Sequence, residues 1–92
     1  MAYSRIVNVE YKSERAMDLF LSKWKDWMPE HMPVATSRTM VKTGPLSSLL
    51  MAVYASSQVV ENAREVVKVF FDENRDHMLD IIAFHGEVIE LN

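Results

Sequence analysis

The run IIAFHGEVIEL, residues 81–91, carries side chains that can do chemistry near the end of the chain. An imidazole and a carboxylate stand two positions apart in it, at His85 and Glu87. Side chains alternate along a strand, so both would point to the same side. Such a pair can transfer protons or bind a metal ion, with Asn8 or Glu10 of the first strand as a neighbour. The same residues also suit a dimer interface with polar groups hydrogen-bonded across a two-fold axis.

A stripe of large apolar side chains, Phe20, Trp24, Trp27 and Met28, recurs at helical spacing earlier in the chain. This stripe could form the wall of a site for a flat aromatic ligand. It could equally be the buried face of an ordinary core helix, which the spacing alone also predicts.

Three further residues have two interpretations each. Arg5 and Arg38 stand on predicted strands, and an inward-facing arginine would pair with an acid or with an anionic ligand. Gly86 is expected to face the helices, where it would make room for a ligand or mark a bulge or a close approach.

The periodicity predicts six elements that must position these residues. Alternation predicts the strands, and Ser13 and Ser56 or Ser57 provide helix N-caps. Pro29 is expected to end the first helix, which leaves His31 in a loop. The expected elements are a strand at 3–12, a helix at 14–28, strands at 34–43 and 48–55 that form a hairpin, a helix at 58–75 and a strand at 81–91.

The order β-α-β-β-α-β predicts an α+β fold of the ferredoxin-like type, a single domain over residues 1–92. Right-handed crossovers give it a four-stranded antiparallel sheet with two helices on one face. We expect Phe84 and Gly86 to face the helices, and His85 and Glu87 to lie on the open face with Asn8. An apolar open face of this size is a liability in a monomer, so we expect a second copy to cover it.

Composition excludes several classes of protein. The net charge of −3 and the scattered basic residues argue against nucleic acid as a partner. The sequence has no cysteine, which excludes a disulfide framework and is weakly in favour of a cytoplasmic location. No apolar run approaches the length of a membrane-spanning helix, so no membrane partner is expected.

The chain resembles the dimeric α+β barrel superfamily in its whole element order, and most specifically in VYASSQVVENA at 53–63. There Tyr54 near the end of the third strand, followed by the capping Ser56, is similar to the antibiotic-biosynthesis-monooxygenase group. The superfamily also includes stress-responsive proteins and many members without known activity. The resemblance implies two subunits packed sheet on sheet, with a cavity between sheet and helices or inside the barrel.

The haem-degrading branch of the superfamily fits poorly. A resemblance to this branch would require an asparagine in the first strand, which Asn8 provides, and a tryptophan and a histidine in the second helix. Ala63 stands at the tryptophan position and the predicted second helix contains no histidine. Two of the three residues are therefore missing.

From these observations we expect an uncharacterised homodimer that acts as a small-ligand-binding or interaction module. The alternative is a cofactor-free monooxygenase-like enzyme acting on a hydrophobic aromatic substrate, with His85 as acid or base and Asn8 or Glu87 orienting. A purely structural dimer is the third interpretation. No metal site and no cofactor are expected, and the residues considered for ligand binding are Glu10, Trp24, Trp27 and Tyr54.

Overall fold

The computed structural model describes residues 1–90 and confirms the predicted element order. It contains four strands, two helices and one turn of 3-10 helix. They are β1 (Tyr3–Tyr11), α1 (Glu14–His31), β2 (Ser37–Gly44), β3 (Ser47–Tyr54), α2 (Ser57–Glu73), η1 (Arg75–His77) and β4 (Met78–Glu87).

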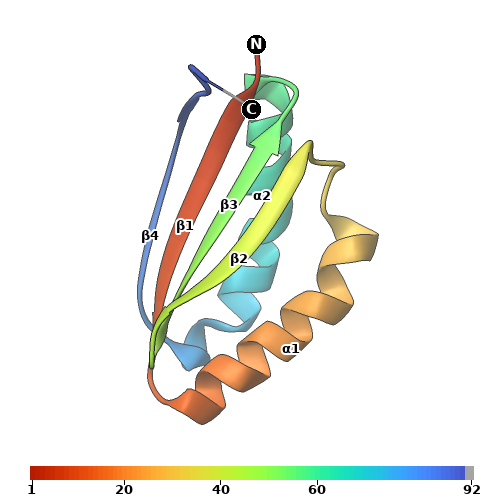
Figure 1. Ribbon diagram of the computed structural model, residues 1–92. Helices are drawn as coiled ribbons and strands as arrows, with labels where there is room; N and C mark the ends of the chain where they lie inside the picture. Colours follow the sequence, from red (N-terminus) through yellow and green to blue (C-terminus); the bar gives the residue numbers. More distant parts are fainter. Residues whose placement is uncertain (91–92) are drawn as a thin grey trace.

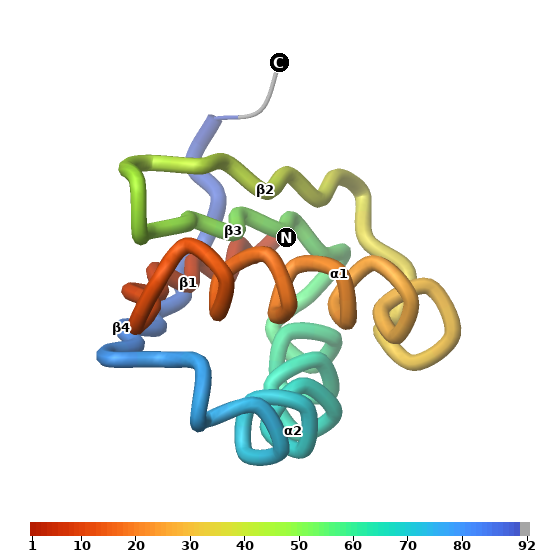
Figure 2. Tube along the Cα trace, turned by 90° about the horizontal axis from the view of Figure 1, so that it is seen from below, coloured from red at the N-terminus to blue at the C-terminus, as the bar shows by residue number. Residues whose placement is uncertain are grey.

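The strands form one antiparallel sheet in the order β2-β3-β1-β4, as the ferredoxin-like fold requires. Both helices lie on the same side of this sheet, α1 toward β2 and α2 behind β1 and β3 (Figure 1). The view from below shows the same arrangement of two helices under a single sheet layer (Figure 2). One face of the sheet is therefore covered and the other is open.

Helix α1 begins where expected and ends later than expected. The Ser13 hydroxyl accepts a hydrogen bond of 3.0 Å from the Ala16 N–H, which caps the first turn. The prediction that Pro29 ends the helix is wrong, because α1 continues to His31. A proline in the last turn removes only one helical hydrogen bond, and the Met32 N–H still closes this turn on the Met28 carbonyl at 3.0 Å.

Two strand boundaries also differ from the prediction. Strand β2 begins at Ser37 rather than at residue 34, and β4 runs from Met78 to Glu87 rather than over 81–91. The turn η1 brings the chain into the sheet three residues early. Residue 91, the last of the predicted strand, lies outside the described residues.

Aromatic side chains form the centre of the core between the sheet and the helices. Phe20 of α1 lies 5.3 Å from the Tyr11 ring of β1, 5.2 Å from Phe70 and 6.1 Å from Phe71 of α2, between ring centroids. Trp24 packs edge-on against Phe70 at 5.4 Å. Such tilted and edge-to-face pairs add to the apolar burial that holds both helices on the sheet.

One hydrogen bond is enclosed in this core. The Tyr11 phenol and the Ser48 hydroxyl are 2.7 Å apart, and both residues are almost fully buried. We expect Tyr11→Phe to cost about 1–3 kcal/mol of unfolding free energy, because it leaves the buried Ser48 hydroxyl without this partner. Urea unfolding should show that Tyr11→Phe with Ser48→Ala costs less than the sum of the single changes. Strict additivity would contradict this prediction.

The same tyrosine gives an alkaline pH dependence. Burial raises the pKa of the Tyr11 phenol above its ordinary value, and the Ser48 hydrogen bond opposes this shift in part. The neutral phenol is therefore favoured in the folded chain. Its contribution to stability is complete below about pH 10 and is lost as the pH rises toward the folded pKa. Tyr11→Phe should remove that part of the alkaline loss.

Candidate functional site

The register of β4 on β1 places the predicted chemical residues on a different face from the expected one. Arg5 is paired with His85 and Val7 with Ala83, and paired residues share a face. Val7 is buried under the helices, so His85 lies on the helix side. The prediction that His85 and Glu87 lie on the open face is wrong, and so is the placement of Phe84 and Gly86 toward the helices.

The structure separates the residues that were expected to act together. Asn8 and Glu10 are paired with Ile82 and Asp80 on the open face. His85 is on the opposite face, so neither Asn8 nor Glu10 can serve as its direct partner. No atom of the described residues lies within 4 Å of the position where a Cβ of Gly86 would stand, which excludes a close helix approach there.

His85 lies in a groove between α2 and β4, which we call the α2–β4 groove, with a volume of about 480 Å³. Its apolar floor includes Val67, Phe71, Ile81 and Ala83, and its polar lining includes Arg5, Glu61, Arg64, Lys68, Asp72 and Arg75. Burial lowers the pKa of the Arg5 guanidinium, and the nearby Arg64 charge lowers it further, whereas the Tyr54 phenol oxygen and the Glu61 carboxylate oppose the shift.

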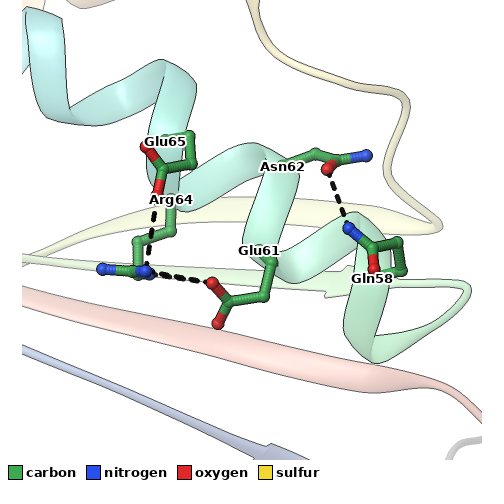
Figure 3. A network of polar contacts seen from close by, with 5 residues as sticks. All are labelled: Gln58, Glu61, Asn62, Arg64 and Glu65. Atoms are coloured by element: carbon green, nitrogen blue, oxygen red, sulfur yellow. Dashed lines mark hydrogen bonds and ion pairs between the residues drawn. The ribbon is translucent and has the colours of Figure 1, made fainter.

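Most of the charges along this groove already have partners on α2. Arg64 donates to Glu61 at 3.0 Å and to Glu65 at 3.4 Å, and Arg75 donates to Asp72 at 2.9 Å. Figure 3 shows the Arg64 guanidinium between its two carboxylates, and beside it the separate hydrogen bond from Gln58 to Asn62. These pairs reduce the positive potential that an anionic ligand would meet in the groove.

A second cavity, which we call the α1–β2 cleft, lies between α1 and the strands β2 and β3 and measures about 420 Å³. Its apolar wall consists of Leu21, Trp24, Met28, Met40 and Leu50. The remaining lining residues are Ser48 and three cations, Lys25, Arg38 and Lys42. Both the volume and the mainly apolar wall are typical of small-molecule sites.

Arg38 is the most constrained of these cations. Its guanidinium donates to the Pro33 carbonyl at 2.9 Å, to the Tyr54 hydroxyl at 3.2 Å and to the Met28 sulfur at 3.3 Å. All three acceptors are neutral. The Nε atom is buried and has no hydrogen-bond partner within the described residues.

The residues predicted to bind a ligand are thus distributed over several places. Trp24 lines the α1–β2 cleft, and the Tyr54 hydroxyl accepts a hydrogen bond from Arg38 of the same cleft. Trp27 does not line this cleft; it packs on Phe70 at 4.9 Å and stacks on His31 at 4.8 Å between ring centroids. Glu10 is exposed on the open face.

The cations and the methionine of this cleft were not predicted to lie together. Arg38, Met40 and Lys42 alternate along β2, and this period of two puts them on one face. That alternation is visible in the sequence, but only the register with β3 determines which side of the sheet these three residues face.

Among the described residues there is no group of three metal-binding side chains and no helix long and apolar enough to cross a membrane.

Comparison with known proteins defines the class by its fold. No protein-family model matches the sequence, and no curated protein matches it. Solved structures match nearly the whole chain, and they show that it has the predicted ferredoxin-like fold.

Three of these structures illustrate the range. A dimeric ferredoxin-like protein from an uncultured marine organism is 13% identical, with a TM-score of 0.78 over 99% of this chain and 90% of that one. A protein of unknown function from Nitrosomonas europaea is 16% identical, with a TM-score of 0.82 over 99% and 92%. SnoaB, a cofactor-independent oxygenase from Streptomyces nogalater, is 7% identical, with a TM-score of 0.74 over 98% and 95%.

Proposed function

We propose that this protein is a homodimer that binds a small molecule on the helix side of its sheet. The observation that carries the dimer is the apolar open face. On this face Met51 of β3 is 43% exposed, and Ile82 and Phe84 of β4 are each 53% exposed. Ile6 of β1 is paired with both Met51 and Phe84, so the apolar surface extends over three neighbouring strands. An uncovered apolar sheet face is a site of association.

A second copy is the occupant that the comparisons support. Two structures of the same fold are described as dimeric ferredoxin-like proteins. In an isologous contact the same apolar residues become buried in both copies. This additional burial stabilises a chain of 92 residues, whose own core is small. Sedimentation equilibrium of the unmodified chain tests this proposal, and a stable monomer at micromolar concentration would overturn it.

Ligand binding is proposed on the helix side because the cavities lie there. The α2–β4 groove and the α1–β2 cleft measure about 480 and 420 Å³, within the range of small-molecule sites. Face-to-face packing of two sheets would leave both cavities accessible. A cytoplasmic location for the dimer remains a prediction from the cysteine-free sequence.

Oxygenation of a hydrophobic aromatic substrate without a cofactor is the second candidate function. It is favoured by His85, which lines the α2–β4 groove together with four apolar residues. There the imidazole would accept the proton of a substrate hydroxyl, and the electron-rich phenolate would reduce dioxygen by one electron. The substrate radical and superoxide would then combine at a ring carbon that carries hydrogen, and the imidazolium would return its proton to the peroxide. Loss of water would leave one oxygen atom on that carbon as a carbonyl, so the substrate supplies both electrons and both hydrogens of the water. Arg5, on the neighbouring strand, would stabilise the phenolate charge.

For this second function we expect His85→Ala to lower the rate of quinol turnover in air at least roughly ten-fold, since general-base catalysis contributes a factor of about 100 or more. Oxygen consumption measures the rate. His31→Ala is the matched control, because His31 stacks on Trp27 at the end of α1, outside the groove. Equal rates for His85→Ala and the unmodified chain, or no turnover by either, would reject the oxygenase.

A further inference from the structure

We infer that the α1–β2 cleft binds a small aromatic or aliphatic compound that carries one anionic group, with Arg38 as the residue that recognises the anion. This inference rests on the proposed ligand binding and names its site and its class of ligand. It follows from the wall of the cleft, from its charges and from the environment of the arginine.

The wall selects an apolar body. Trp24 and Leu21 of α1 face Met40 of β2 and Leu50 of β3 across the cavity of about 420 Å³. Tryptophan offers a flat surface, and methionine adapts its three rotatable bonds to the shape beside it. A ring or a short hydrocarbon fits such a wall better than a sugar or a phosphate ester does.

The charges select an anion. Within residues 1–90, three cations line the cleft and no carboxylate does, although the whole chain has a net charge of −3. The one hydroxyl in the lining, that of Ser48, is hydrogen-bonded to the Tyr11 phenol at 2.7 Å. The cleft is thus positive while the chain as a whole is negative, and this local excess attracts a negatively charged ligand.

Arg38 has the environment of a residue that recognises an anion. A half-buried guanidinium loses hydration, and its neutral acceptors at Pro33, Tyr54 and Met28 compensate this loss only in part. The buried Nε of Arg38 has no hydrogen-bond partner in the part of the chain that the structure describes. The contacts to Pro33 and Tyr54 fix the plane of the guanidinium, so that a carboxylate entering the cleft would meet an oriented donor.

The α2–β4 groove differs from the α1–β2 cleft in the partners of its cations. It contains four cationic side chains, but Arg64 and Arg75 there are bonded to carboxylates of α2. A carboxylate ligand would have to compete with these acids. In the α1–β2 cleft the described residues provide no such competitor for Arg38.

Two probes of equal shape test the inference, sodium 2-naphthoate and the neutral 2-naphthamide. In calorimetric titrations we expect the carboxylate to bind the unmodified chain roughly ten-fold more tightly than the carboxamide, as a charge-assisted hydrogen bond would produce. Binding should shift the Trp24 indole resonance in the nitrogen-15 NMR spectrum. Equal affinity for the two probes, no binding of either, or shifts confined to the α2–β4 groove would overturn the inference.

Variants assign the preference to Arg38. Arg38→Gln should remove the preference for naphthoate, whereas Lys23→Gln, which removes a cation of α1 outside the cleft, should retain it. A folded Arg38→Gln protein with an unchanged preference would show that Arg38 only braces the Pro33 segment. If Arg38→Gln does not fold, Arg38→Lys, which keeps the charge but loses the fork, should reduce the preference several-fold. Sedimentation measures the dimer separately, so the two proposals can fail independently.

Discussion

Replacing Phe20 by alanine is expected to lower the free energy of unfolding by about 3–5 kcal/mol, the range measured for large aromatic side chains removed from cores. Phe20 is 1% exposed and contacts the rings of Tyr11, Phe70 and Phe71. It joins β1, α1 and α2, and alanine would leave a cavity that three separate elements would have to close. Small domains have only about 5–15 kcal/mol in total, so much of the stability would be lost.

Leu19→Ala is the matched control, because Leu19 is the preceding residue of α1 and is 42% exposed on its outer side. We expect a change within about 0.5 kcal/mol for it, as for other surface positions. Urea unfolding followed by circular dichroism, at several protein concentrations to separate folding from association, measures both variants. A loss below about 1 kcal/mol for Phe20→Ala would mean that the core closes around the gap.

The order of the elements could be predicted from the sequence because each has a local physical cause. A period of two in β1, the serine caps at Ser13 and Ser56 and the apolar stripe of α1 each specify one element without tertiary contacts. Two helices and four strands in this order then permit few right-handed topologies. The ferredoxin-like fold followed from these local signals.

The face of β4 could not be predicted in the same way. The rule that apolar residues face the helices failed for Phe84, because β4 is an edge strand and α2 does not extend fully over it. On the helix side Ala83 and His85 remain exposed, and on the open side Ile82 and Phe84 form part of an apolar surface. With apolar residues on both sides, only the register with β1 decides which side is which.

The candidate site depended on that same register. Trp24 and Tyr54 were among the residues predicted to bind a ligand. Trp24 lines the cleft together with Arg38, and the Tyr54 hydroxyl accepts a hydrogen bond from Arg38, but Arg38 could not be assigned to a face from β2 alone. Pairing of Arg38 with Ala52 and of Met40 with Leu50 places both β2 residues on the helix side. A ligand site built by three elements is a tertiary property, and no local pattern defined it.

Phe84→Glu distinguishes the two placements of this strand. If Phe84 were part of the helix-facing core, a carboxylate there would unfold the chain. On the open face, where Phe84 is 53% exposed, the single chain should fold with nearly unchanged secondary structure and lose its ability to dimerise. Val69→Glu is the matched control, because Val69 is 56% exposed on the outer side of α2.

The expected effect on the affinity of the dimer is large because both copies carry the substitution, so each change occurs twice in a two-fold interface. Full burial of an exposed phenylalanine contributes about 1.5–3 kcal/mol, and Phe84 is 53% exposed, so the pair contributes roughly 1.5–3 kcal/mol to association. With 1.4 kcal/mol for each factor of ten, Phe84→Glu should weaken the dimer at least roughly ten-fold, and the buried carboxylates weaken it further. Sedimentation equilibrium should show a folded monomer for Phe84→Glu and a dimer for Val69→Glu. A Phe84→Glu dimer of unchanged affinity would place the contact between copies elsewhere on the molecule, and the apolar open face would then require a different partner.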